Sequence, residues 1–169
     1  DRGEDLERQD FFVYFNAPAD VAGTTFLLWK HPEEEDDRWL YLPALDLVRR
    51  IAASDERTSF VGSHFFYEDV SGRSPEEDTH SLVEETEHYY VLESRPKNPG
   101  DVEFASYRNW IHKASFIPVK TEYTNAAGEI YRRYEVLQVE TIDGFVSVVQ
   151  SRMSDLKKDA RTTLTYRNI

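Results

Sequence analysis

Short runs of alternating apolar and polar residues fill the last third of the chain, and this pattern restricts the fold more than any other feature. Between residues 116 and 123, every second residue from Ile117 onward is apolar, aromatic or β-branched, whereas Lys120 and Glu122 face the opposite side. A loop with Gly128 follows, and Gly readily takes the left-handed backbone of a hairpin turn. Runs at 130–139, 146–153 and 161–167 continue the series. The pattern predicts a meander of neighbouring antiparallel strands.

Similar runs occur earlier. Pro43 separates two short runs, 39–42 and 45–51, that we interpret as paired strands. We expect further strands at 11–15, 24–30, 79–85 and 87–94, and a strand or a short helix leading into one at 104–113. About nine or ten short strands with few helical patterns predict a mainly β fold, a strongly curved antiparallel sheet that is either an open half-barrel or a closed, lipocalin-like barrel.

The segment from Phe60 to Tyr67 interrupts this alternation. It carries four aromatic residues around Gly62 and Ser63 without strand or helix periodicity. Four aromatic side chains are too many for an ordinary solvent-exposed loop, so we expect this segment to cover an apolar surface.

Composition limits the classes of function. The 169 residues fit one domain, and 40% hydrophobic with 14% aromatic residues indicate a folded chain. A net charge of −12 argues against nucleic acid and against adsorption to anionic lipid. The chain has no run of 18 apolar residues, so we expect no membrane-spanning helix, and without Cys it forms no disulfide or thiol site.

Candidate catalytic and metal sites are weak. Glu33–Asp37 is an acidic run that we interpret as a solvated turn rather than a calcium site. His80 and His88 flank several glutamates but lie too far apart along a strand to share an ion. Ser63 and His64 are sequence neighbours, which rarely gives triad geometry. We therefore expect no metal, no cofactor and no enzymatic activity; a small enzyme on a lipocalin-like barrel is the third-ranked alternative.

Arg49 and Arg50 adjoin each other in an expected strand, so their side chains point to opposite faces. One of them should face the side that carries Leu and Phe residues, where an unpaired charge is costly. It would bind either an anionic headgroup, as a polar anchor, or an internal partner among Asp46, Glu68 and Asp69.

Several motifs together resemble the outer-membrane lipoprotein-sorting protein family, the LolA-like periplasmic carriers. They cover most of the chain from about Phe11 and are listed here in order: WLYLPAL at 39–45, VRRI at 48–51, SFVGSHFFYED at 59–69, WIHK at 110–113, FIPVK at 116–120, Glu122-Tyr123, Gly128 and TTL at 162–164. The resemblance implies the open half-barrel of LolA and LolB, with residues 60–67 in a short helical plug on its concave face. Relatives carry an N-terminal helix and first strands before the position where this chain starts, so we expect a single domain over 1–169 that lacks them.

The resemblance also implies a function: a non-enzymatic periplasmic carrier or chaperone that binds lipid or lipoprotein acyl chains for transport to the outer membrane. Its partners would be envelope transport proteins, including a lipid-exporting pump. The expected groove residues are apolar or aromatic: Trp29, Leu40, Leu42, Phe60, Phe65, Phe66, Tyr107, Trp110, Val119 and Tyr123. The alternative is a protein-interaction or sensing module on the same scaffold, associated with an envelope export system, in which these rings only pack the core.

Overall fold

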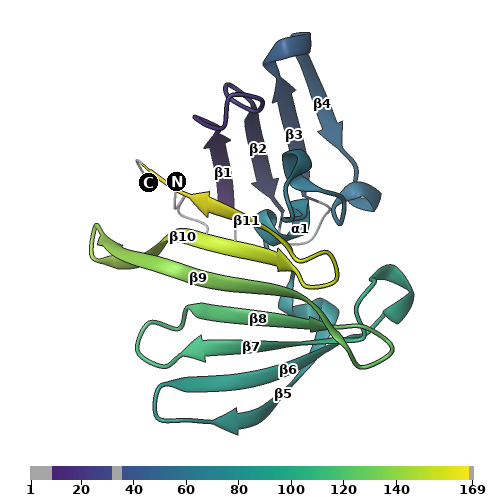
Figure 1. Ribbon diagram of the computed structural model, residues 1–169, viewed down its shortest axis with the longest axis vertical. Helices are drawn as coiled ribbons and strands as arrows, with labels where there is room; N and C mark the ends of the chain where they lie inside the picture. The colour runs from purple at the N-terminus through teal and green to yellow at the C-terminus, as the bar shows by residue number, and fades with distance from the viewer. Residues whose placement is uncertain (1–8, 32–35, 168–169) are drawn as a thin grey trace. The chain divides into compact units, whose positions relative to one another are not determined.

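Eleven strands and one short α-helix form in the parts of the chain that the computed structural model describes, residues 9–31 and 36–167 (Figure 1). The elements are β1 (Gln9–Tyr14), β2 (Thr25–Lys30), β3 (Asp37–Leu42), β4 (Leu47–Ile51), α1 (Tyr67–Ser71), β5 (Asp78–Glu85), β6 (Tyr89–Pro96), β7 (Ser106–His112), β8 (Pro118–Thr124), β9 (Ile130–Ile142), β10 (Phe145–Asp155) and β11 (Ala160–Thr165). Short 3₁₀ turns connect some of them. The expected mainly β chain with few helices is confirmed.

The strands form two antiparallel sheets, and neither closes into a barrel (Figure 1). One sheet has the order β1-β2-β3-β4, and the other has the order β11-β10-β9-β8-β7-β6-β5. The expected open sheet is thus confirmed, but hydrogen bonding divides it into a four-stranded and a seven-stranded part. The division falls between β4 and β5, where residues 52–77 form turns and α1 instead of a further strand.

The chain divides into two compact units built around these sheets. The four-stranded unit lies within Asp1–Gly62 and Phe66–Gly72, and the seven-stranded unit lies within Arg73–Ile169 together with Ser63–Phe65. The chain therefore passes from one unit to the other three times, near residues 62, 65 and 72.

One face of the four-stranded sheet is buried under aromatic residues from the segment after β4. Phe26 and Leu28 of β2 are fully buried on this face, beside Leu40 of β3. The Phe60 ring lies 5.2 Å from that of Phe26, and the Tyr67 ring of α1 lies 5.7 Å from it. The first contact is edge-to-face and the second is tilted, and such ring contacts add to the stabilisation that apolar burial gives. The Phe60–Tyr67 segment therefore covers an apolar surface, as expected.

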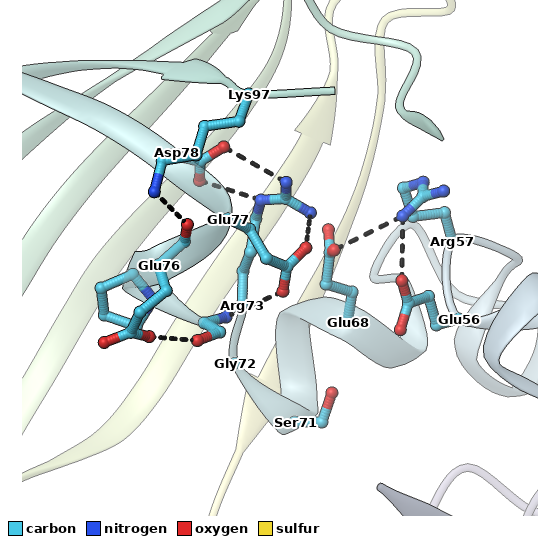
Figure 2. A network of polar contacts seen from close by, with 12 residues as sticks. Glu56, Arg57, Glu68, Ser71, Gly72, Arg73, Glu76, Glu77, Asp78 and Lys97 are labelled. Atoms are coloured by element: carbon cyan, nitrogen blue, oxygen red, sulfur yellow. Dashed lines mark hydrogen bonds and ion pairs between the residues drawn. The ribbon is translucent and has the colours of Figure 1, made fainter. Parts of the chain in front are cut away.

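A chain of ion pairs between buried and half-buried side chains fixes the same segment to the sheet. Arg38 of β3 is 5% exposed, and its guanidinium lies 3.3 Å from the Glu56 carboxylate. Arg57 in turn lies 3.0 Å from Glu56 and 3.6 Å from Glu68 of α1, as Figure 2 shows. Because each buried charge has an opposite charge beside it, the cost of burying these groups is offset.

Glycines form the hairpin turns in which the backbone must be left-handed. Gly128 has φ +81° in the loop between β8 and β9, as the sequence predicted. Asp143 and Gly144 both have positive φ between β9 and β10. Two positive-φ residues are characteristic of the type I′ turn, whose twist matches that of the strands it joins.

Alkaline pH is expected to destabilise the seven-stranded unit through Tyr166, the residue after β11. Burial raises the pKa of Tyr166 to about 12 from an ordinary value of 10.0. Between these pH values the unfolded chain loses the phenol proton while the folded chain keeps it, so stability is full below pH 10 and falls as pH rises toward 12. Urea titrations at pH 10 and pH 12 measure the fall in unfolding free energy, and this fall should be about 2 kcal/mol smaller in Tyr166→Phe than in the unmodified chain. Tyr14→Phe, at a 55% exposed ring, is the control; an unchanged pH slope in Tyr166→Phe would contradict the assignment.

Candidate functional site

The two faces of the seven-stranded sheet differ in chemistry. Residues that pair across the strands share a face, and one row runs through Ser94, Tyr107, Tyr123 and Arg132, with Tyr134 in the adjacent row. We call this side the aromatic face. The opposite rows carry ionised side chains on every strand from β6 to β11, and we call that side the charged face.

A compact ring cluster lies on the aromatic face. Phe104, 3% exposed, has its ring 5.5 Å from those of both Tyr107 and Tyr123. Arg132 is 6% exposed, and its guanidinium lies 5.4 Å from the centre of the Tyr123 ring. This arrangement places a cation against an electron-rich ring in an apolar environment, which is favourable when both are removed from water.

Three residues from far upstream in the chain, Ser63–Phe65, also pack on the aromatic face, and we call them the strap. The Phe65 ring lies 6.4 Å from that of Tyr134. The Thr162 hydroxyl is hydrogen bonded to both the backbone N–H of His64, at 3.1 Å, and its imidazole Nδ1, at 2.8 Å. Arg132 donates a hydrogen bond of 2.9 Å to the His64 carbonyl. Hydrogen bonds at His64 and the buried Phe65 ring thus hold the strap on this face.

A buried polar cluster adjoins Tyr107 and Ser94 at one end of this row, and Figure 2 shows two of its members, Asp78 and Arg73. The Asp78 carboxylate has a side chain that is 0% exposed, and it pairs with Arg73 at 2.9 Å. Tyr107 donates a hydrogen bond of 2.7 Å to it. Burial, and then the hydrogen bond to Asp78, raises the pKa of Tyr107. The Ser94 hydroxyl, 0% exposed, lies 2.8 Å from Nδ1 of His80. These polar groups therefore act as hydrogen-bonding and ion-pair partners for one another.

The expected groove residues separate between the two units. Leu40 and Phe60 are core residues of the four-stranded unit, and Leu42 lies on the same face as Leu40. Trp29 lies on the opposite face of that sheet and is 41% exposed. Phe66 precedes α1, where its backbone N–H donates to the Asp69 carboxylate.

In the seven-stranded unit, Phe65, Tyr107 and Tyr123 come together on the aromatic face. Trp110 does not join them, because it pairs with Val91 and Lys120 on the charged face. The Lys120 ammonium lies 3.9 Å from the centre of its ring. Val119 lies in a β-bulge of β8, between the residues that pair with Trp110 and Ile111.

Arg49 and Arg50 point to opposite faces of β4, as expected. Arg49 shares the face of Leu40 and pairs with Asp55 at 3.4 Å, whereas Arg50 pairs with Asp37 at 2.7 Å. Hydrogen bonds from Arg50, and then from His31, hold the pKa of Asp37 below its ordinary value. The acids differ from those that we considered, Asp46, Glu68 and Asp69, because the turn after β4 brings Asp55 back to the strand.

The sequence interpretation did not place Arg132, His64 and Tyr134 on this face. A signal for Arg132 and Tyr134 existed, since residues two apart on a strand share a face. For His64 there was none, because its partner Thr162 is 98 residues away.

The described residues contain neither a cluster that could bind a metal nor a helix that could span a membrane. In 9–31 and 36–167, no group of three His, Asp or Glu side chains could hold a metal ion. Most of the acidic run Glu33–Asp37 lies outside the described residues, so it is not part of this result. No described helix has the length and apolar composition needed to cross a membrane.

Comparison with known proteins identifies the family. A family model with the description "-like: Uncharacterized protein" matches residues 7–169. A DUF1329 family protein from Desulfovibrio piger has 28% identity and a TM-score of 0.81, over 98% of this chain and 72% of its own. An outer membrane lipoprotein-sorting protein domain from Vibrio parahaemolyticus has 28% identity and a TM-score of 0.76, over 93% and 68%. The chain belongs to the LolA-like family.

A LolA superfamily protein from Nitrosomonas europaea extends the LolA-like comparison. It shares 18% identity and a TM-score of 0.60, over 95% of this chain and 74% of its own, which supports the fold alone. No curated protein gives a significant match. The LolA-like chain therefore has the fold of lipoprotein-sorting carriers, with an aromatic face on its larger sheet.

Proposed function

We propose that this LolA-like chain is a non-enzymatic periplasmic carrier that binds lipid or lipoprotein acyl chains and acts as one domain. The observation that supports the proposal is the aromatic face of the seven-stranded sheet, on which the Phe65 ring of the strap packs 6.4 Å from that of Tyr134. The relative from Vibrio parahaemolyticus, with its lipoprotein-sorting description, supports the same class of cargo. Envelope transport proteins, such as a lipid-exporting pump, would be its partners.

An acyl chain would bind by replacing the strap. When Phe65 leaves Tyr134, the rings and Met153 beside it become available to apolar ligands. Each buried CH₂ group of a ligand contributes about 0.8 kcal/mol, so a chain of ten carbons compensates for the strap contacts that it displaces. The lost hydrogen bonds at His64 cost about 1 kcal/mol each.

Arg49 and Arg50 of the four-stranded unit, whose side chains are both 59% exposed, are the proposed anchors for an anionic headgroup. Because they point to opposite faces of β4, one headgroup would pair with only one of them. Both already pair with carboxylates, so a headgroup would share its cation with Asp55 or Asp37.

Leu164 of β11 gives a direct test because it lies on the aromatic face, opposite Ser151, and is half-buried. Leu164→Glu places a carboxylate where the acyl chain would lie, and we expect at least a tenfold loss of affinity for a fluorescent fatty acid. Thr163→Glu puts the same charge on the neighbouring residue, which faces the charged side, and should bind normally. Native mass spectrometry with envelope lipid extract measures retention. If the unmodified chain retains no lipid and binds no fatty-acid probe, the carrier function is refuted.

A protein-interaction or sensing role is the second candidate, and the other face of the four-stranded sheet favours it. Phe12 and Tyr14 of β1, Trp29 of β2 and Val48 of the edge strand β4 are between 41% and 70% exposed there. Exposed aromatic patches are typical of interaction surfaces. A chain that retains no lipid but loses association with an envelope protein after Phe12→Ser would support this role instead.

A further inference from the structure

The charged face of the seven-stranded sheet has the opposite sign to the rest of the protein. From β6 to β11 it carries six cationic and four anionic side chains, which are listed here in strand order: Glu93, Arg95, Arg108, Lys120, Glu122, Arg133, Glu135, Glu140, Arg152 and Arg161. Glu84 adds one more carboxylate at the β5 edge. The whole chain has a net charge of −12, so this excess of cations is local.

Two of the carboxylates each lie between two cations. Glu93 lies 2.6 Å from Arg95 and 3.2 Å from Arg108. The hydrogen bond from Arg95, and then that from Arg108, holds the pKa of Glu93 below its ordinary value. Glu122 repeats the arrangement, 2.8 Å from Lys120 and 2.9 Å from Arg133. A guanidinium has five N–H donors, so these arginines keep donors for further acceptors.

The carboxylates lie deeper than the cations around them. The side chains of Glu93 and Glu122 are 17% and 10% exposed, whereas those of Arg95 and Arg108 are 62% and 54% exposed. Arg133 is 34% exposed above Glu122. Solvent, or a partner molecule, therefore meets a layer of guanidinium groups with its counter-charges beneath.

We infer that the charged face is a docking surface for an acidic patch on a partner protein. Arg108 and Arg133 stand on β7 and β9, two strands apart, so carboxylates about 10 Å apart on the partner would reach both. Arginine in a fixed geometry favours bidentate carboxylate pairing, which gives orientation as well as affinity.

A protein patch fits better than a membrane surface. The Debye length is about 8 Å at physiological ionic strength, so a small acidic patch docked on this face interacts mainly with the cations of the face itself. An anionic membrane is extended and would also meet the acidic remainder of a chain with net charge −12. The same electrostatics speeds encounter with the correct partner.

The test removes two cations without leaving a carboxylate unpaired. Arg108→Gln with Arg133→Gln leaves Arg95 beside Glu93 and Lys120 beside Glu122. The probe is a fluorescent peptide of ten glutamates, measured by anisotropy with the full chain at low and physiological salt. We expect salt-sensitive binding by the unmodified chain and about tenfold weaker binding by the double variant.

A matched control removes two cations elsewhere. Lys97→Gln with Lys158→Gln makes the same change in net charge at exposed positions off this face and should bind the peptide normally. Equal losses in both double variants, or no peptide binding by the unmodified chain, would overturn the inference. So would binding to phosphatidylglycerol vesicles that depends on Arg108 and Arg133 while the peptide is ignored, since that outcome assigns the face to a membrane. Lipid retention is measured separately and does not enter this result.

Discussion

Phe60→Ala is expected to cost about 3–5 kcal/mol of unfolding free energy, the largest single effect in the four-stranded unit. Phe60 is 1% exposed, and its ring lies between 5.2 and 5.5 Å from those of Phe15, Phe26 and Tyr67. Removing it leaves a cavity that three aromatic rings cannot easily collapse to fill. Urea denaturation followed by tryptophan fluorescence measures the loss, because Trp29 and Trp39 both belong to this unit.

Phe12→Ala is the matched control for Phe60→Ala. The same side chain is removed from β1, but at a position that is 70% exposed, and the expected cost is below about 1 kcal/mol. Similar costs at the two positions would show that Phe60 is not the centre of the cover over this sheet.

Asp78→Ala is expected to cost about 3 kcal/mol, the second large effect. The substitution leaves the Arg73 guanidinium, 14% exposed, without its bidentate partner and with Glu77 as a remaining counter-charge, and it removes the acceptor of the Tyr107 hydroxyl. Removing one member of a buried pair is costly because the remaining charge stays out of water. Thermal and urea unfolding of the full chain, followed by circular dichroism, measure the change.

Glu77→Ala tests whether burial is the reason for the Asp78 effect. Glu77 lies 2.7 Å from the same Arg73, but its side chain is 47% exposed, so we expect less than 1 kcal/mol. Tyr107→Phe removes one hydrogen bond and should cost about 1 kcal/mol. An Asp78→Ala effect no larger than that of Glu77→Ala would contradict the buried-pair interpretation.

The alternation of side chains predicted the strands because it follows directly from the geometry of an extended backbone. The same rule could have separated two groove candidates, since Tyr107 and Trp110 are three residues apart on one strand and must face opposite sides. The sequence interpretation grouped them by aromatic character instead. Residue type therefore misassigned a face that spacing alone could assign.

The sequence could not predict how the segment around Phe60 divides its side chains between the two sheets, and the reason is different. The segment has no periodicity, so nothing in it indicates that Phe60 and Tyr67 pack on one sheet while Phe65 packs on the other. The contacts of the strap join residues nearly a hundred positions apart, and such pairings depend on tertiary structure. The division into two sheets after β4 also depends on tertiary structure, so the sequence did not predict it.

The three passages of the chain between the units bear on how such proteins can diversify. Ser63–Phe65 is encoded with the smaller sheet but packs on the larger one. A genetic crossover near residue 72 would join β5–β11 of one parent to the Ser63–Phe65 tripeptide of another. The imidazole and carbonyl of His64 and the ring of Phe65 would then have to fit Thr162, Arg132 and Tyr134 from a different parent. The two halves of the chain therefore cannot be exchanged freely between relatives, and a folded chimera needs Ser63–Phe65 and the strands on which it packs from the same parent.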